Sequence, residues 1–577
     1  MNINLQSAIR TFSCVVSISL FTYSCSKEDI QINEITQEVV EEEPSLEIVD
    51  SKLMQNPYSI SNMRAAYAKV VSEMNKGAIT TGKGGFTSKE VDTALVPNYL
   101  YVRFDPKNDV EEDRLMTFQD ILVIDYPFEY DNSEHYRSVV PATPGKTNSY
   151  WASVPVGQNF PPDVAMTILE EMYIPEKDPD YDINNGSGKL TSKDAIDDKI
   201  DFMNHVVNAA FEATGNEELI PPVAEKGESC ETCFLGINFR DKWRPSGRLM
   251  INDNTLGTIP MVGVNVLVRD TWTLDSQITG ADGRFTFKEL RAKVKYIIQW
   301  DRYEFSIRDN SGLTQAEDVS NDKLYKEAWN KTITGGREKY RGEIFQAAYH
   351  YYYQNIGGLT RPPTNGFLKT QIKIAAVEKN EGPSSTKMAV GSDTFGVVPH
   401  IKIKQYGLTS DRVYGTTIHE LAHAAHYASA SIWYGGIVKE AYIYNLGSDN
   451  PGPAGASARR FLESWATGVE IYLTQLHYVG LGSNGYKYRT ENLQNRASRG
   501  LLENRFYTTG IYDTTDAVNQ RDFFGSDVPF DPVSGVSWST LQSALAGSTN
   551  WESFRNKLIT LYPAKERDIN ALFANWN

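Results

Sequence analysis

The sequence predicts a multidomain α+β protein, and three observations support this expectation. The chain has 577 residues, which is more than one hydrophobic core can serve, so three or four domains are expected. Helix-like and strand-like patterns alternate near the N-terminus, short alternating strands fill the middle, and helical periodicity dominates the C-terminal part. We therefore expect a mixed α/β domain at 51–235, a small β-sandwich at 244–310 and a mainly helical domain at 311–577.

The composition fits a globular protein and excludes one class of partner. Hydrophobic residues make up 41% of the chain and aromatic residues 11%, which is enough to build several cores. The formal net charge is −16, and such a charge repels phosphate groups. We therefore expect no nucleic acid partner and no binding to anionic membrane surfaces through the protein surface.

The first 25 residues have the pattern of a secretory signal. Arg10 supplies positive charge, and residues 14–23 form a mostly apolar run that is too short to span a bilayer. The end of this segment, Leu-Phe-Thr-Tyr-Ser before Cys25, resembles a bacterial lipobox, which implies lipidation of Cys25. The following residues 26–29, Ser-Lys-Glu-Asp, are similar to the export signal of surface lipoproteins in some Gram-negative bacteria. The resemblance implies an outer membrane lipoprotein exposed at the cell surface; the alternative is an ordinary cleaved signal.

Residues 26–50 have the composition of a tether. Its part from 30 to 50 has little apolar content and contains six glutamates: Glu34, Glu38, Glu41, Glu42, Glu43 and Glu47. Such a segment cannot bury enough apolar surface to fold alone. We expect it to hold the folded part away from the membrane.

The predicted N-terminal domain contains both helices and strands. Apolar spacing predicts helices at 59–76, 110–116, 165–172 and 195–214, and strands at 99–104 and 121–126. None of these elements carries a recognisable chemistry. Near the end of this domain, Cys230 and Cys233 form a Cys-x-x-Cys pair without a second pair to complete a zinc site. In an oxidising compartment a local disulfide is the simplest state, and a redox role is the alternative.

The middle of the chain has the pattern of a small β-sandwich. Alternating apolar residues predict strands at 248–251, 264–269, 277–279, 284–287 and 296–300. The segment Thr-Gly-Ala-Asp-Gly at 279–283 is a turn signature. The pattern resembles the carboxypeptidase regulatory-like domain, a transthyretin-type sandwich, and this resemblance implies a structural or adhesive role.

The strongest motif of the chain is His-Glu-x-x-His at His419, Glu420 and His423. Residues four apart lie on one face of a helix, so both imidazoles can point at one metal ion, for which zinc is the natural choice. Glu420 lies about 100° further round the helix, where it can reach a metal-bound water. No Gly or Pro occurs from 416 to 433, as a buried active-site helix requires.

A third protein ligand must come from elsewhere in the chain. His426 lies on the same face, but it is about 10 Å along the helix from His419 and cannot share the ion unless the helix breaks. Three glutamates compete for the role: Glu440, Glu463 and Glu470. Glu463 is embedded in the apolar stripe of a second helix, and a buried acid needs a partner such as a metal ion.

The residues Glu463 to Ala466, Glu-Ser-Trp-Ala, together with the His-Glu-x-x-His helix resemble the gluzincins, the thermolysin-like zinc peptidases. This resemblance implies a zincin-type C-terminal domain, Zn²⁺ held by His419, His423 and Glu463, and Glu420 as general base in the hydrolysis of a protein or peptide substrate. One departure is Thr467, which stands where thermolysin has an aspartate that orients a histidine.

Two further parts of such a site remain open in the sequence. The group that stabilises the oxyanion has four candidates: Tyr472, His477, Tyr507 and Tyr512. Predicted strands at 368–377 and 397–404 are candidates for binding an extended peptide through a free edge. The alternatives to a surface-anchored peptidase are a zinc module without catalysis and an adhesin that binds glycans or proteins.

Overall fold

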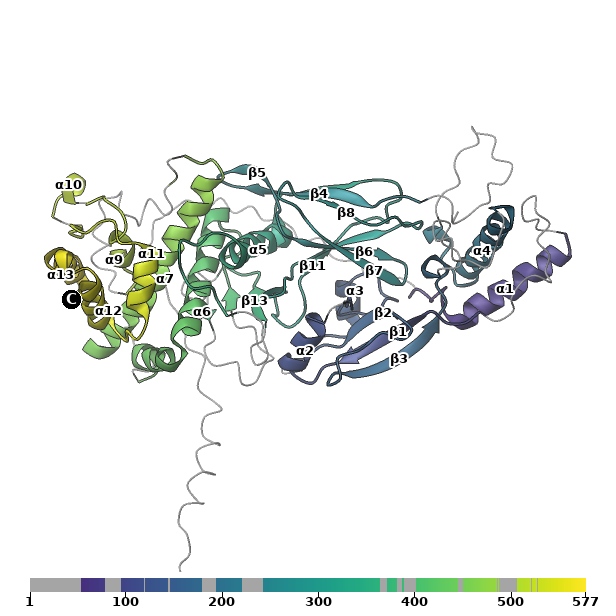
Figure 1. The fold of residues 1–577 in the computed structure, drawn as a ribbon, viewed down its shortest axis with the longest axis horizontal. Helices are drawn as coiled ribbons and strands as arrows, with labels where there is room; N and C mark the ends of the chain where they lie inside the picture. The colour runs from purple at the N-terminus through teal and green to yellow at the C-terminus, as the bar shows by residue number, and fades with distance from the viewer. Residues whose placement is uncertain are drawn as a thin grey trace, which may run out of the picture. The chain divides into compact units, whose positions relative to one another are not determined.

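The computed structural model places the described residues in two units of the fold (Figure 1). Of the described residues, the N-terminal unit contains those from 53 to 253 and 257–342, and the C-terminal unit contains Asn254–Leu256 and those from Glu343 onward. The structure describes residues 53–77, 95–118, 120–143, 146–178, 193–220, 242–363, 371–380, 387–388, 401–444, 450–484, 486, 506–519, 521–526 and 528–576. The expected signal peptide at 1–25, the tether at 26–50, the lipidation site Cys25 and the pair Cys230 and Cys233 lie outside these residues.

The boundary between the units differs from the expected start of the C-terminal domain at residue 311. Helix α5 (Gly336–Tyr353) contains the boundary, which falls after Gly342. The intervening strands β11 (Glu317–Val319) and β12 (Trp329–Ile333) pair with strands of the β-sandwich. Residues 311–342 therefore belong with the sandwich.

The N-terminal unit begins with helices and a small sheet. Helix α1 (Ile60–Asn75) packs on α4 (Lys193–Ala213), where the rings of Tyr67 and Phe202 lie 5.1 Å apart. Strands β1 (Tyr99–Asp105), β2 (Tyr150–Pro155) and β3 (Ala165–Met172) form an antiparallel sheet in the order β2-β1-β3. The shorter helices of this unit are α2 (Asp109–Met116), α3 (Ser133–Val139), η1 (Pro175–Lys177) and η3 (Glu217–Leu219).

Two secondary-structure predictions for this region are wrong. Residues 165–172 were expected to form a helix, but they form β3, which pairs with β1 from Ala165 to Met172 with one register shift at Leu169. The segment is rich in Leu, Met and Glu, which favour helices, and most of its side chains are exposed at the sheet edge, so it lacks a strand-like alternation. Residues 121–126 were expected to form a strand, but they make only an isolated bridge between Ile124 and Trp151.

The region that was expected to form a β-sandwich, and that is called the sandwich below, contains two sheets. One sheet has the order β11-β9-β6-β7, and the other has the order β12-β4-β5 with β8 also paired to β4. The remaining bounds are β4 (Ser246–Asp253), β5 (Gly257–Pro260), β6 (Asn265–Asp270), β7 (Thr273–Ile278), β8 (Arg284–Thr286) and β9 (Lys295–Gln299). Strand β10 (Phe305–Arg308) belongs to neither of these two sheets. Leu267, Trp272 and Ile297 of the sandwich share one apolar core with Tyr101 and Phe128. The sandwich and the preceding α/β part are therefore joined by a common core.

The C-terminal unit is mainly helical and also contains a few short strands. Strand β15 (Ile401–Ile403) pairs in parallel with β13 (Ile372–Ala376) and antiparallel with β14 (Lys387–Met388). Two helices of 29 residues each, α6 (Ser410–Val438) and α7 (Gly452–Gly480), run side by side (Figure 1). A π-helix, η6 (Lys439–Ile443), directly follows α6.

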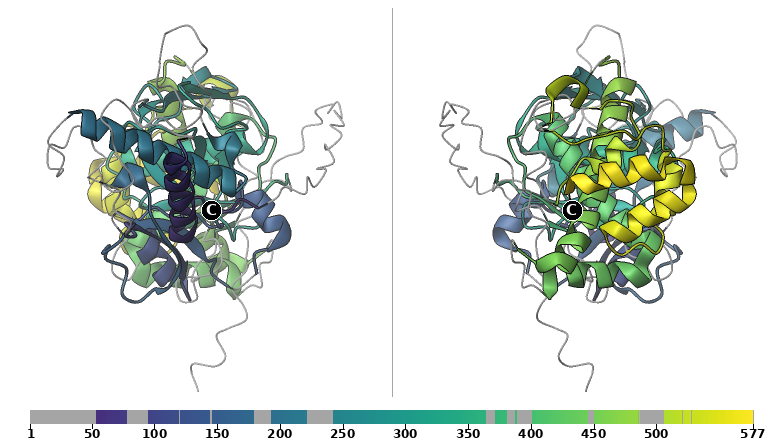
Figure 2. Two further views of the ribbon diagram at one scale, coloured as in Figure 1. Left: turned by 90° about the vertical axis from the view of Figure 1, so that its right-hand side faces the viewer. Right: turned by 90° about the vertical axis from the view of Figure 1, so that its left-hand side faces the viewer.

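The short helices at the C-terminus are the yellow segments of Figure 2, and two of them, α9 and α12, pack against α7. Their bounds are α9 (Gly510–Asp513), α10 (Arg521–Phe524), α11 (Trp538–Leu545), α12 (Trp551–Leu561), η7 (Pro563–Lys565), α13 (Glu566–Phe573) and η8 (Ala574–Trp576). The rings of Phe461 on α7 and Phe554 on α12 lie 5.4 Å apart. Among the helices that the structure describes, none combines the length and the apolar character needed to cross a bilayer.

Candidate metal centre

Helix α6 places the two histidines of the motif on one buried face. Its first turn is held by Asn254, whose side-chain oxygen accepts a hydrogen bond from the backbone N–H of Ser410 at 3.0 Å. His419 is 2% exposed and His423 is 1% exposed, and their rings lie 4.9 Å apart. The helix continues regularly past both histidines and bends only at Ala430, which has non-helical backbone angles. The four-residue spacing therefore aligns both imidazoles toward the same neighbour.

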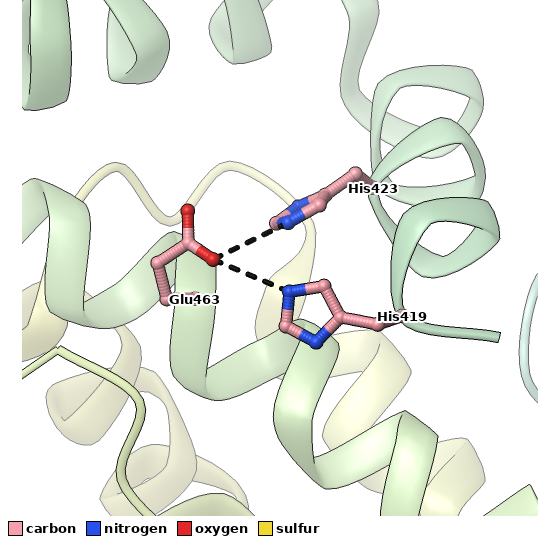
Figure 3. A group of neighbouring side chains, drawn as sticks. All are labelled: His419, His423 and Glu463. Atoms are coloured by element: carbon pink, nitrogen blue, oxygen red, sulfur yellow. Dashed lines mark hydrogen bonds and ion pairs between the residues drawn. The ribbon is translucent and has the colours of Figure 1, made fainter. Parts of the chain in front are cut away.

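Helix α7 supplies the carboxylate that the two imidazoles face (Figure 3). Glu463 is 0% exposed, and its Oε2 atom lies 3.3 Å from Nε2 of His419 and 3.5 Å from Nε2 of His423. One ligand atom from each of the three side chains lies within 4.8 Å of the others. The sequence-predicted ligands His419, His423 and Glu463 thus converge at one buried point.

The electrostatics of this point are governed by the carboxylate. Burial by itself would raise the pKa of Glu463, but the two imidazoles outweigh it through charge and hydrogen bonds and hold the pKa well below its ordinary value. Glu463 is therefore ionised in the folded protein and provides a negatively charged oxygen where both imidazole nitrogens point.

A second carboxylate from α7 holds the opposite side of one imidazole. Oε2 of Glu470 lies 3.0 Å from Nδ1 of His419, and Glu470 is 0% exposed. An ionised carboxylate only accepts hydrogen bonds, so in this contact Nδ1 carries the proton, and the lone pair of Nε2, on the side of Glu463, can bind a metal. Glu470, one of the three glutamates considered as third ligand, is therefore not in the three-residue group but contacts one of its histidines.

Tyr442 of the π-helix holds the other oxygen of Glu463. Its hydroxyl donates a hydrogen bond to Oε1 of Glu463, and both side chains are buried. The guanidinium of Arg459, one turn before Glu463 on α7, contacts the ring of Tyr442 at 5.0 Å. The two carboxylate oxygens of Glu463 therefore have different neighbours.

Three further residues were considered for the site from the sequence, and only one of them, Glu420, belongs to the motif itself. Glu420 is buried on α6 directly after His419, as the motif requires. Glu440 lies partly exposed in η6 and is outside the three-residue group. His426 packs against the rings of Tyr434 and Phe461, and neither of its ring nitrogens has a hydrogen-bond partner among the described residues. Burial lowers the pKa of His426 to about 3, so it is neutral.

Of the four candidates for the oxyanion group, one lies beside the centre. The ring of Tyr507 is 6.0 Å from the ring of His419. The other three contact groups away from the ligands: Tyr472 stacks on Trp538, His477 stacks on Tyr414, and Tyr512 donates to Gln475. Ser464 on α7 donates to the backbone oxygen of Phe506 at 2.9 Å and so holds the segment that carries Tyr507.

One of the two strands considered for peptide binding, β15, was expected to have a free backbone edge. Strand β15, from the predicted segment 397–404, is paired on both sides, with β13 and with β14. Its described backbone therefore offers no free edge, and the prediction of strand addition at β15 is wrong.

Sequence reasoning considered Glu470 only as a possible third ligand and missed Tyr442. Glu470 follows Glu463 by seven residues, two helical turns, so both lie on the same face of α7, and this spacing could have assigned it beside the ligands. Tyr442 has no comparable signal, because it reaches Glu463 from a separate element. Comparison of the chain with protein-family models, with curated proteins and with solved structures found no match.

Proposed function

We propose that the protein is a zinc-dependent metallohydrolase. More specifically, we assign it as a gluzincin-type peptidase that hydrolyses protein or peptide substrates. The observation that carries this assignment is the convergence of His419, His423 and Glu463 from two helices, with Glu420 next to the first histidine. Two imidazoles and one carboxylate are a donor set that zinc favours in catalytic sites.

The number of ligands supports catalysis over a purely structural role. Structural zinc sites use four protein ligands, whereas catalytic sites use three and keep one position for water or substrate. In the part of the chain that the structure describes, the group contains three residues of the ligand types. His426, the nearest further histidine on α6, lies among aromatic rings instead.

Each residue of the centre has a role that follows from its contacts. Nε2 of His419, Nε2 of His423 and Oε2 of Glu463 would hold the ion, and Glu470 keeps the proton of His419 on Nδ1. When bound, zinc would acidify a water molecule and polarise the substrate carbonyl. Glu420 would accept the proton of that water and transfer it to the leaving amine. The hydroxyl of Tyr507 is the candidate donor to the oxyanion.

The location of the protein is part of the same proposal. Lipidation of Cys25 would anchor the chain in the bacterial outer membrane, with residues 26–50 as the tether to a surface-exposed peptidase. Metabolic labelling with a radioactive or alkyne fatty acid tests this: label should enter the wild-type chain and be lost in Cys25→Ser. Labelling that is equal in both would contradict the anchor.

The function is tested by metal analysis together with digestion of a broad peptide library. The purified chain should contain about one zinc ion, cleave peptides, lose activity with a chelator and regain it with zinc. Glu420→Gln should abolish cleavage and leave zinc binding intact, because Glu420 is not among the ligands. Glu440→Gln is the matched control and should leave both properties unchanged. A chain that binds zinc but cleaves no peptide in the library, with Glu420→Gln indistinguishable from wild type, would favour a non-catalytic surface module.

A further inference from the structure

The π-helix after α6 brings a tyrosine back to the candidate metal centre. Residues 439–443 of η6 directly follow the last residue of α6, and Tyr442 is buried against α7. π-Helical turns are rare and occur frequently at functional sites. Tyr442 contacts the centre through its hydroxyl, which donates to Oε1 of Glu463.

Because of this hydrogen bond, the two carboxylate oxygens of Glu463 have different partners. Oε2 faces Nε2 of His419 and Nε2 of His423, whereas Oε1 faces the tyrosine hydroxyl. A hydrogen bond from a hydroxyl to a carboxylate is about twice as strong as one between neutral groups. Rotation of the carboxylate to present both oxygens to the imidazoles would break this bond and leave a buried hydroxyl to find another acceptor.

Groups outside the ligand set fix the tyrosine ring. The guanidinium of Arg459 lies 5.0 Å from the centroid of the Tyr442 ring and 4.4 Å from the centroid of the Phe506 ring. Arg459 is buried, and cation–π contacts gain strength when the cation is shielded from water. We call Arg459 and Phe506 the brace of Tyr442. Ser464 on α7 is hydrogen-bonded to the backbone of Phe506 and of Thr508, so α7 also fixes the position of Phe506.

We infer that Tyr442 is a positioning residue that restricts Glu463 to a single metal-binding oxygen. Arg459, which also contacts the ring of Phe506, lies against the ring of Tyr442, and the hydroxyl of Tyr442 is hydrogen-bonded to Oε1 of Glu463. This inference rests on the metal-binding part of the proposed function and is independent of which bond is cleaved. It differs from a role for Tyr442 in stabilising the oxyanion, because a positioning residue acts on the metal before any substrate is present.

The test is Tyr442→Phe, which removes the hydroxyl and keeps the ring that Arg459 contacts. Zinc affinity of the full folded chain is measured by competition with a chromophoric chelator, without substrate. We expect affinity to fall about 10- to 100-fold, the usual effect of losing a group that orients a metal ligand. In the cobalt-substituted chain, visible absorption should weaken, since a carboxylate free to bind through both oxygens raises the coordination number. Tyr478→Phe is the matched control: Tyr478 is buried on α7 against Tyr414 and Tyr486.

The outcomes separate this inference from the proposed function. Unchanged zinc affinity and an unchanged cobalt spectrum in Tyr442→Phe would overturn the inference, even if turnover falls, because that pattern belongs to an oxyanion donor. A wild-type chain that binds no zinc would overturn the proposed function as well. If Tyr442→Phe does not fold, Phe506→Leu tests the brace instead: zinc affinity should fall by a smaller factor, and an unchanged affinity would contradict the inference.

Discussion

Glu470 and His419 form a buried pair in which a carboxylate oxygen of Glu470 lies 3.0 Å from Nδ1 of His419. The pair joins α6 to α7 on the side of the imidazole that faces away from Glu463. Of the described acidic side chains, Glu470 is the one that is hydrogen-bonded to Nδ1 of His419. We therefore expect Glu470, seven residues after Glu463, to orient the imidazole of His419.

Glu470→Gln should weaken zinc binding by about 10- to 100-fold, because a neutral amide orients His419 less strongly and makes it a weaker donor. The measurement is chelator competition on the folded chain. Glu440→Gln, a glutamate outside the ligand group, serves as the control with unchanged affinity. Equal zinc affinity in Glu470→Gln and wild type would show that the pair does not support the centre.

Zinc should stabilise the folded chain, because the three ligands converge only when α6 and α7 are packed. Free zinc at a thousand times its dissociation constant is expected to add about 4 kcal/mol to the free energy of unfolding and to raise Tm. Glu463→Ala should lose this response, whereas Glu420→Gln should keep it. The measurement is thermal unfolding of metal-free protein with and without zinc; a zinc-induced rise in Tm that persists in Glu463→Ala would argue against Glu463 as a ligand.

The stability of the metal-free chain should fall as the pH decreases below about 6.5. Burial lowers the pKa of His350 to about 4 and that of His477 to about 3, from an ordinary value of 6.5. The folded chain favours the neutral form of each histidine more than the unfolded chain does. Their contribution to the free energy of unfolding is therefore complete above pH 6.5 and is lost as the pH falls toward the lowered pKa values. The loss is at most about 1.4 kcal/mol per pH unit for each histidine. Urea unfolding between pH 7 and 4.5 measures the slope. His477→Gln should show a shallower slope than wild type, and parallel slopes would refute the assignment.

Ser464→Ala should destabilise the C-terminal unit. The Ser464 hydroxyl donates to the oxygen of Phe506 and accepts from the N–H of Thr508, and it is fully buried. Removing it leaves two backbone groups without this partner, at a cost of about 1–3 kcal/mol. Denaturant unfolding measures the change. Ser429→Ala, at an exposed serine that bonds only within its own helix, should change the free energy of unfolding by less than about 0.5 kcal/mol.

Gly283→Ala should disrupt the β-sandwich. Gly283 has a φ of +78°, and a Cβ atom there would lie 2.3 Å from the backbone oxygen of Leu249. Gly257→Ala is the matched control, because Gly257 has a φ of +71° and nothing within 4 Å of its Cβ position. We expect the control to lose about 1–2 kcal/mol for the left-handed backbone alone, and Gly283→Ala to lose clearly more. If denaturant unfolding shows that both variants lose the same free energy of unfolding, the backbone around residue 283 can move to accommodate the Cβ atom, and the prediction is wrong.

Sequence patterns predicted a helix or strand correctly where the residues of that element alone determine its structure. Periodicity predicted helices within α6 and α7 and the strands β4, β6, β8 and β9, whereas β5, β11 and β12 were not predicted; the turn at Gly283 follows from its signature. The helix expected at 165–172 is a strand because pairing with β1 outweighs the helix preference of its residues. The free edge expected at 397–404 does not exist because β14 and β13 flank β15.

The sequence by itself determined that His419 and His423 share a helix face and that Glu463 sits in an apolar stripe, because helical geometry converts spacing directly into position. Only the tertiary structure decided which glutamate meets the imidazoles, that Glu470 faces Nδ1 of His419, and that Tyr442 holds Oε1 of Glu463. These contacts join residues 21 to 51 positions apart in the chain. Such contacts depend on how separate helices pack, and no local period in the sequence encodes that packing.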